Sequence, residues 1–564
     1  MPQAQPQAGF QLFQQHRALL DQAVEATRSR GYWSPFAEMP SPRSYGEQAN
    51  ELGKAAFEAR LHQPFELNQP GTVGEVGNEV SPYGERLEVR YPKVNLDVLL
   101  HAAGQAAESW RKSGPEAWVG VSLEILTRLN QRSFEMAYAV MHTTGQAFMM
   151  AFQAGGPHAQ DRGLEAVAYA WQEMDRVPRT AVWEKPQGKN PPLKMEKRFA
   201  IAPRGIALVI GCCTFPTWNG YPGLFASLAT GNAVVVKPHP GAILPLAITV
   251  EIARGVLAEN GFDPNVVTLV AHGAGDSTAQ ELALRPEIKI MDFTGSPAHG
   301  EWLERNAHQA VVFTEKAGVN SIIVDSTADF AGMARNIAFS LALYSGQMCT
   351  APQNILVPRE GIQTPEGAMS FDQVAQGLAQ AVRKLTADPA KAVEILGAIQ
   401  NDEILARLEQ SKANARPEDI LLDRQELAHP QFPGARIRTP LLLKAEAREQ
   451  IRFMHEVFGP VAFVIATASS AESLALAGRA ARERGALTLS VYSTDPGVIE
   501  AAREAALQGG VALSENLTGG VFVNQSAAFS DFHGTGANPA ANSSLTDTAF
   551  VASRFRIVQS RSHV

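Results

Sequence analysis

The sequence contains very little cysteine, and this scarcity excludes several kinds of protein. Only three cysteines occur in 564 residues, and two of them, Cys212 and Cys213, are adjacent. Three thiols cannot build a disulfide framework, and no Cys/His spacing matches a zinc site. We therefore expect reduced thiols, a cytoplasmic location and no bound metal.

The chain also lacks a long hydrophobic run and an excess of basic charge. No apolar run approaches the ~18 residues that a membrane helix needs, and no basic stretch followed by an apolar core opens the chain. The 49 basic and 57 acidic side chains give a net charge of −8. Because this balance provides no broad basic surface, we expect neither nucleic-acid nor membrane partners.

What the sequence does contain is an alternation typical of α/β proteins. Short β-branched runs such as "IALVI", "AVVVK" and "VVFTE" are separated by segments of helical length, and a second such alternation starts at Ser321. This pattern predicts doubly wound parallel sheets. Upstream, the spacing of Leu99, Ala103 and Ala106 predicts a helix capped by Asn95. Residues 1 to about 90 show little periodicity, and the stretch "PFELNQPGTVGEVGNEVSPYGE" within them predicts loops and short strands of an N-terminal arm.

The ends of the predicted strands carry the first candidate functional residues, because ligands of such sheets bind there. Lys237 ends one strand, Gly295 and Ser296 join another to a helix, and Glu315 ends a third. Ser296 can cap that helix, whose first turn can hold a pyrophosphate. Each feature alone is better explained by ordinary turn or surface chemistry.

The third cysteine lies in "YSGQMCTAP". Cys349 follows Glu315 by 34 residues and precedes a further acid, Glu456, in "HEVFGPVAF". A lone cysteine is usually an inert buried side chain, so a chemical role depends on such partners.

The order and spacing of these segments resemble the NAD(P)-dependent aldehyde dehydrogenase superfamily from about residue 95 to 530. Five family motifs are matched by "GNAVVVKPHP", "DFTGSPAHG", "EKAG", "GQMCTAP" and "EVFGPV". Other segments, including "FSDFHGTGANPAANSSLTD", resemble the phenylacetic acid degradation (PaaN-type) branch. Its relatives include semialdehyde dehydrogenases of aerobic benzoyl-CoA and phenylacetyl-CoA catabolism.

The resemblance implies an enzyme that oxidises an aldehyde, expected to be a CoA-tethered semialdehyde, to the acid. Cys349 would attack the carbonyl, hydride would pass to NAD(P), and water activated by Glu315 would hydrolyse the thioester. By the same analogy Glu456 would bind the nicotinamide ribose, Phe458 would support the ring, and Lys237 would reach ribose hydroxyls.

Two departures from the family pattern change the expected details. Counting back from Asn232 places Thr214 where the family has its oxyanion asparagine. We therefore expect the Thr214 hydroxyl to hold the oxyanion and Asn219 to line the substrate channel. Three residues after Lys237 stands Pro240 instead of the glutamate of many NAD-preferring relatives. This favours NADP and leaves NAD possible.

The resemblance also implies an aldehyde dehydrogenase-like α/β architecture with a β-arm for oligomerisation. Its expected parts are an N-terminal arm and helical part (1–188), a crossover (189–203), a Rossmann-type cofactor domain (204–317), a catalytic domain (318–525), and a C-terminal loop and strand (526–564). Because a bare arm leaves sheet edges unprotected, we expect a homodimer or a dimer of dimers.

Three alternatives remain open at this stage. A CoA-acylating aldehyde dehydrogenase would pass the acyl group to CoA instead of water, but such enzymes generally lack the glutamate base. A non-catalytic member of the fold is a second alternative. The third is a plain nucleotide-binding module in which Cys349 belongs to the core.

Overall fold

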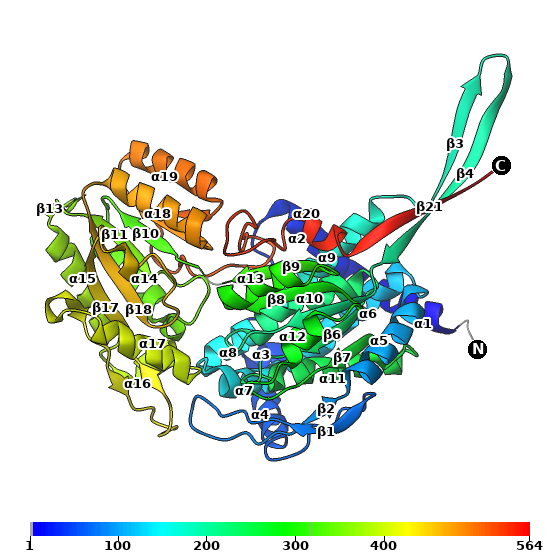
Figure 1. Cartoon of the computed structure of the whole chain (residues 1–564), viewed down its shortest axis with the longest axis horizontal. Coiled ribbons are helices and arrows are strands. Elements are labelled where there is room, and N and C mark those ends of the chain that lie inside the picture. Colours follow the sequence, from blue (N-terminus) through cyan, green and yellow to red (C-terminus); the bar gives the residue numbers. More distant parts are fainter. Residues whose placement is uncertain (1–3, 317, 564) are drawn as a thin grey trace.

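The two α/β alternations form two separate parallel sheets. The computed structural model describes residues 4–316 and 318–563. Figure 1 shows one sheet near the centre of the molecule, the second in a lobe to its left, and a thin arm projecting to the upper right. The expected aldehyde dehydrogenase-like fold class is therefore confirmed.

The first sheet has the strand order β7-β6-β5-β8-β9 and is parallel throughout. Its strands are β5 (Ile206–Ile210), β6 (Ala233–Lys237), β7 (Val267–Leu269), β8 (Ile288–Gly295) and β9 (Val311–Lys316). Helices α10 (Pro216–Ala229), α11 (Leu244–Glu259), α12 (Thr278–Ala283) and α13 (Pro297–Asn306) connect them. The strand order reverses between β5 and β8, which is where doubly wound sheets bind ligands.

The second sheet has the order β14-β17-β18-β11-β10-β19-β20, in which only the edge strand β14 is antiparallel. Its strands are β10 (Ser321–Val324), β11 (Asn354–Pro358), β14 (Ile420–Leu422), β17 (Leu441–Glu446), β18 (Val461–Thr467), β19 (Thr488–Tyr492) and β20 (Ala512–Glu515). The larger helices of this lobe are α14 (Phe330–Ala342), α15 (Phe371–Leu385), α16 (Pro389–Leu396), α17 (Asp402–Ala413), α18 (Ser470–Arg484) and α19 (Pro496–Gly509).

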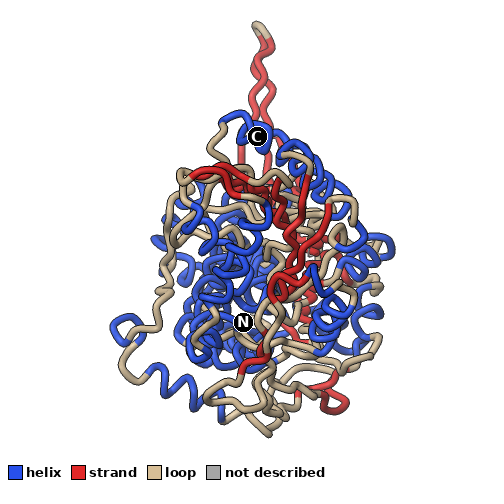
Figure 2. Tube along the Cα trace, turned by 90° about the vertical axis from the view of Figure 1, so that its left-hand side faces the viewer, coloured by secondary structure: helices blue, strands red, loops and turns tan. Residues whose placement is uncertain are grey.

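The arm is a sheet of β3 (Thr180–Gln187), β4 (Asn190–Pro203) and β21 (Phe555–His563) in the order β21-β4-β3. Figures 1 and 2 both show it standing clear of the body. Its first strand lies before residue 189, inside the segment that the sequence assigned to the N-terminal part, because β3 pairs with β4 as a hairpin.

Residues before the first sheet are more helical than expected. The helix capped by Asn95 is confirmed as α5 (Leu96–Arg111), with the Asn95 side chain accepting from the Val98 amide. It is followed by α6 (Pro115–Gln131), α7 (Ser133–Thr144), α8 (Phe148–Gly155) and α9 (Pro157–Asp175).

The prediction of loops and short strands for residues 64–85 agrees with the structure, whereas residues 4–58, which showed little periodicity, are mostly helical. The structure has α1 (Ala4–Gln15), α2 (Arg17–Ser29), α3 (Pro42–Tyr45) and α4 (Ala49–Glu58) there, and strands follow in the hairpin of β1 (Thr72–Val76) and β2 (Tyr91–Val94). These helices lack side-chain caps at α2, α3 and α4. They depend on tertiary contact: a Cβ on Gly9 of α1 would lie 2.3 Å from the Ala117 Cβ of α6.

A buried ion pair fastens the C-terminal segment to the first sheet. Arg554, which is fully buried, donates to both carboxylate oxygens of Asp292 on β8 at 2.6 and 2.7 Å and to the Ser227 hydroxyl at 2.7 Å. Gly223 leaves room for this pair, since a Cβ there would lie 2.3 Å from Asp292 Cγ.

Replacing Arg554 with Met should lower the free energy of unfolding by about 3–5 kcal/mol, because it leaves the Asp292 carboxylate buried without a counter-charge. Chemical denaturation measures the loss. Arg556→Met, two residues on at an exposed position, is the matched control. Equal stability of the two variants would contradict the assigned importance of the pair.

Candidate active site

The backbone before Cys349 is held in an unusual conformation. Tyr344 and Ser345 have positive φ angles of 52° and 50°, and Gly346 follows with 66°. Consecutive left-handed residues other than glycine are costly and persist only where the surroundings hold them. Here the Tyr344 hydroxyl donates to the Thr144 carbonyl, and the Ser345 hydroxyl lies 3.0 Å from the Leu396 carbonyl oxygen.

The residues after Cys349 are fixed by an asparagine from the start of the second sheet. The Asn320 amide donates to the carbonyls of Cys349 at 2.8 Å and Ala351 at 2.9 Å, and its own oxygen accepts from the Leu487 and Thr488 amides. The thiol therefore sits on a loop whose two ends are both anchored.

Glu315, at the end of β9, meets this thiol. Its Oε1 lies 3.6 Å from Cys349 Sγ, 3.0 Å from His533 Nε2 and 2.9 Å from Asn219 Nδ2. His533 Nε2 is in turn 3.7 Å from Cys349 Sγ. The structure thus brings Glu315 and Cys349 together as the sequence predicted, and adds an imidazole and an amide on the same oxygen.

The charges around this cluster decide which group carries a proton. Burial on its own would raise the pKa of Glu315, but the neighbouring His533 and the Arg162 guanidinium outweigh it and lower the pKa to about 2. Burial and the Glu315 charge raise the pKa of the Cys349 thiol well above its ordinary value. In the protein without ligands, the pair is therefore a carboxylate facing a protonated thiol, and the ionised Glu315 is available to accept a proton.

Sequence reasoning missed two members of the cluster, His533 and Arg162. Arg162 is buried, its guanidinium lies 3.6 Å from the centre of the Trp218 ring, and its Nη1 has no hydrogen-bond partner among the described residues. His533 stands in the quoted segment that carried the branch resemblance, and Arg162 lies 371 residues before it in the chain. No local spacing rule connects such positions; only the fold does.

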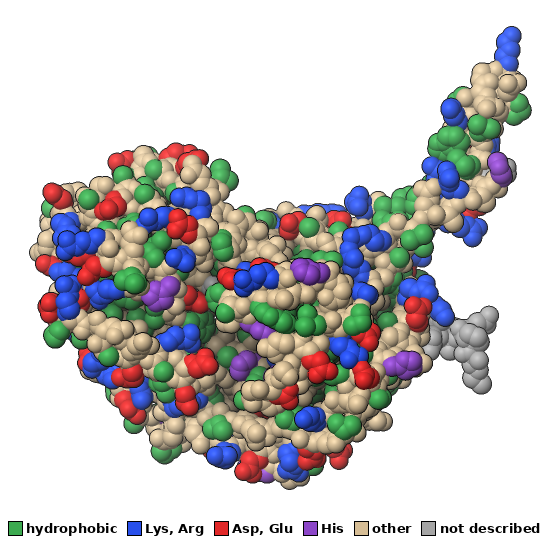
Figure 3. All heavy atoms as spheres, in the orientation of Figure 1, with side chains coloured by type: hydrophobic (Ala, Val, Ile, Leu, Met, Phe, Trp, Pro, Cys, Tyr) green, Lys and Arg blue, Asp and Glu red, His purple; other side chains and the backbone are tan. Residues whose placement is uncertain are grey.

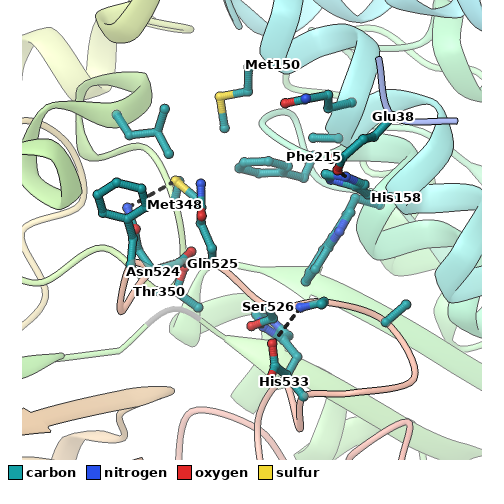
Figure 4. Close-up of a pocket in the computed structure, with 18 of the residues that line it drawn as sticks. Glu38, Met150, His158, Phe215, Met348, Thr350, Asn524, Gln525, Ser526 and His533 are labelled. Atoms are coloured by element: carbon teal, nitrogen blue, oxygen red, sulfur yellow. Dashed lines mark hydrogen bonds and ion pairs between the residues drawn. The ribbon is translucent and has the colours of Figure 1, made fainter. Parts of the chain in front are cut away.

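A cavity of about 780 Å³ opens in front of Cys349. It is largely apolar, with Met150, Phe215, Trp218, Met348 and Phe522 among its lining residues, and Asn219 and His533 border it as well. Figure 4 shows the Met348 and Asn524 side chains on one side of this space, with His533 and Ser526 below. The volume suits a small-molecule substrate.

Asn219 and Thr214, the two residues weighed for the oxyanion, take different positions. Asn219 lines the cavity, where the sequence expected it, and its amide donates to Glu315. Thr214 is not among the described lining residues; its hydroxyl points to Cys212 Sγ at 4.0 Å and its carbonyl accepts from Gln146. No described hydrogen bond joins Thr214 to the thiol, so its oxyanion role stays a hypothesis.

The candidate cofactor residues lie at the carboxyl ends of β6 and β8, on either side of β5. Lys237 is 5% exposed, and no ion pair of its ammonium group occurs among the described residues. Ser296 is the N-cap residue of α13, but its side chain makes no capping hydrogen bond. Nearby, the buried His272 Nε2 has no partner in the described part of the chain. Polar side chains without a hydrogen-bond partner, next to the first turn of a helix, fit the ribose and pyrophosphate of a dinucleotide.

Glu456 and Phe458 come from the segment that follows β17. This segment is tied to the Cys349 loop by Gln353, which accepts from the Val457 amide at 2.7 Å and donates to the His455 carbonyl at 3.0 Å. Burial raises the pKa of Glu456 to about 8, opposed by Arg407. Gln353 therefore connects the segment that contains Glu456 and Phe458 to the Cys349 loop.

One ligand set for a metal exists in the described residues. A carboxylate oxygen of Glu315, the Cys349 sulfur and a His533 nitrogen lie within 4.8 Å of one another. Zn²⁺ accepts all three ligand types. These atoms are also the ones that the thiol chemistry needs, so an ion there would block the nucleophile.

Comparison with known proteins assigns the chain to one family. The model of the aldehyde dehydrogenase family matches residues 89–536. The chain belongs to this family. A crystal structure of an NAD-dependent aldehyde dehydrogenase from Burkholderia multivorans is 67% identical, with a TM-score of 0.96 over 98% of this chain and 99% of that one.

More distant members of the family share the architecture. A 1-pyrroline-5-carboxylate dehydrogenase of Bacillus subtilis is 25% identical over 75% of this chain and 78% of its own length. The Thermus 1-pyrroline-5-carboxylate dehydrogenase with bound NAD superposes with a TM-score of 0.72 at 20% identity, over 95% of this chain and 99% of that one. The protein is thus an aldehyde-oxidising enzyme with a nicotinamide cofactor. None of these three relatives is described as a member of the phenylacetic acid degradation branch.

Alkylation of Cys349 by iodoacetamide in the ligand-free enzyme should keep rising with pH beyond pH 9, because only the thiolate reacts and its pKa is raised. Glu315→Gln should speed alkylation at pH 7.5, since it removes the negative charge beside the thiol. Glu301→Gln, an exposed acid on α13, should leave the rate unchanged. Slower alkylation of Glu315→Gln would mean that the carboxylate promotes rather than opposes thiolate formation.

Proposed function

We propose that Cys349 is the nucleophile and Glu315 the general base of this aldehyde dehydrogenase. The observation that carries the proposal is the single oxygen, Glu315 Oε1, that lies 3.6 Å from the sulfur while His533 and Asn219 contact it at 3.0 and 2.9 Å. A carboxylate held ionised beside the sulfur is placed to take a proton from the water that attacks an acyl group on that sulfur.

The residues of the chain act in the following order. Cys349 loses its proton to solvent and its sulfur bonds to the aldehyde carbon, whose oxygen becomes an alkoxide. The bound nicotinamide cofactor supplies the hydride acceptor. Collapse of the alkoxide leaves a thioester on Cys349. A water molecule then loses its proton to Glu315 as its oxygen attacks the thioester, and the carbon–sulfur bond breaks to release the acid.

The alkoxide oxygen needs hydrogen-bond donors. We assign one to the backbone amide of Cys349 and keep Thr214 as the hypothesis for the second, with Asn219 as a channel residue that also orients Glu315. The single-turnover rates of Thr214→Val and Asn219→Ala separate the two residues. Arg162 and His533 hold the negative charge of Glu315 and are positioning residues.

Glu315→Gln should release about one NAD(P)H per active site in a burst and then turn over slowly, because acylation needs the thiol whereas deacylation needs a base for water. Stopped-flow absorbance of the reduced cofactor measures both phases. Cys349→Ala, which removes the nucleophile, should show neither. If the burst itself disappears in Glu315→Gln, the carboxylate is required to activate the thiol.

For the cofactor, we propose that NADP is accepted along with NAD. The relative from Burkholderia multivorans is NAD-dependent according to its description. The support for NADP is the absence, among the described residues, of a carboxylate paired with Lys237, and the presence of Pro240 where an acid would repel a 2′-phosphate. Burial lowers the pKa of Lys237 to about 8, so it remains largely cationic at neutral pH.

Pro240→Glu should weaken NADP binding more than NAD binding, because a carboxylate about 4 Å from a phosphate costs about 1–4 kcal/mol. Dissociation constants for both cofactors, measured by fluorescence titration, give the ratio. An unchanged ratio would place residue 240 away from the adenosine ribose.

For the substrate, we keep the CoA-tethered semialdehyde of aromatic-acid degradation as the proposal. Among the described lining residues of the cavity there is no Lys or Arg, so the CoA phosphates would have to remain outside it. Because the cavity offers no Lys or Arg to bind a carboxylate, it also disfavours the small carboxylated aldehyde that the name of the Bacillus subtilis relative implies. A CoA-acylating reaction is disfavoured by Glu315, which would hydrolyse the thioester.

The oligomeric state of the protein is also a proposal. The arm exposes Val182, Leu193 and Val558, at 65%, 46% and 56%, which favours a dimer or dimer of dimers that covers them. Sedimentation velocity tests this. No helix in residues 4–316 and 318–563 is long and apolar enough to cross a membrane. On the face drawn in Figure 3, acidic and basic side chains are interspersed.

A further inference from the structure

A segment near the N-terminus forms part of the substrate cavity. Tyr32, Trp33, Ser34 and Glu38 line it together with His158 and Asp161 of α9. These N-terminal residues lie before residue 89, where the match to the family model begins. This wall is therefore outside the part of the chain that the family model describes.

The segment is fastened to the loop that carries His533. Arg30 donates to the Phe529 carbonyl at 3.1 Å and to the Tyr169 hydroxyl at 2.6 Å, and its guanidinium lies 4.6 Å from the centre of the Phe532 ring. The Trp33 ring packs edge-on against Phe529 at 4.9 Å. The wall is thus fixed relative to the catalytic cluster.

Some polar groups of this wall have hydrogen-bond partners and one does not. Glu38 and His158 pair at 3.0 Å and meet on the side of the cavity away from Met348 and Asn524 (Figure 4). Asp161, one turn after His158 on α9, is only 4% exposed, and its Oδ1 has no hydrogen-bond partner in the described structure. A buried carboxyl oxygen at a cavity wall without a partner points to a ligand group that completes it.

The charge of the cavity restricts what that group can be. The lining acids are Glu38, Asp161, Glu394 and Asp531, and no Lys or Arg is found among the described lining residues. An anionic tail would be repelled by the charges of Glu38, Glu394 and Asp531, and the lining histidines His158 and His533 are already paired with acids. Burial and the charges of Glu165 and Glu38 raise the pKa of Asp161 well above its ordinary value. A protonated Asp161 both donates and accepts hydrogen bonds.

We propose that Asp161 and Ser34 form a distal subsite for an uncharged, hydrogen-bonding tail of the aldehyde, such as a hydroxyl, an amide or a thioester carbonyl. The proposal rests on the proposed aldehyde oxidation at Cys349 and adds to it a selection of the substrate by its far end. A free carboxylate at that end is rejected.

A series of aldehydes of equal length tests the subsite: hexanal, 6-hydroxyhexanal, 6-oxohexanamide and 6-oxohexanoate. In the wild-type enzyme, kcat/KM should be roughly tenfold higher for the hydroxyl and amide tails than for hexanal, as one buried hydrogen bond provides, and lowest for the carboxylate. Equal values for the four, or a preference for the carboxylate, overturns the subsite. Failure to oxidise any of them argues against the proposed function instead.

Three variants assign the effect to the named residues. Asp161→Leu should abolish the preference for the neutral polar tails while hexanal is still oxidised, which shows that the enzyme is folded. Asp161→Asn, which keeps an uncharged donor and acceptor, should retain it. Ser34→Ala should reduce it, whereas Ser44→Ala, at an exposed serine of the same N-terminal part, should not. Loss of the preference in Asp161→Asn, or an equal effect of Ser44→Ala, contradicts the assignment.

Discussion

The active site depends on keeping one carboxylate ionised inside the protein. A buried anion is unfavourable unless hydrogen bonds and opposite charge compensate it. Glu315 receives both: Asn219 and His533 contact one oxygen, and Arg162 supplies positive charge from α9. Each of these partners comes from a different part of the chain. Through its contacts, the Glu315 side chain therefore links α9, α10, β9 and the C-terminal loop.

The thiol that faces this carboxylate is held by backbone constraints instead of charge. The left-handed residues Tyr344 and Ser345 turn the chain sharply before Cys349, and Asn320 fixes the carbonyl of the cysteine itself. Such a turn places the sulfur at the cavity without a helix or strand to carry it. Rigid anchors on both sides keep the sulfur, and any acyl group that it carries, within reach of Glu315.

Two segments outside the sheets complete the cavity. The N-terminal residues 30–38 and the C-terminal loop that holds His533 contact each other through Arg30, Trp33 and Phe529. The C-terminal side of this contact is anchored further by Arg554 on Asp292. Since loops vary more readily than sheets, the chemistry can stay constant on the scaffold while the far wall of the cavity selects the substrate.

The sequence by itself determined the α/β fold, the helix capped by Asn95, and the pair of Glu315 and Cys349, because these follow from short-range periodicity and from motifs in a fixed order. It did not reveal the helices before residue 59, which pack on α6, α7 and α9 and whose stability comes from these contacts rather than from caps. Nor did it reveal His533, Arg162 or the unpartnered oxygen of Asp161. Their roles arise from distances between atoms whose residues are far apart in the chain, and only the tertiary structure decides such distances.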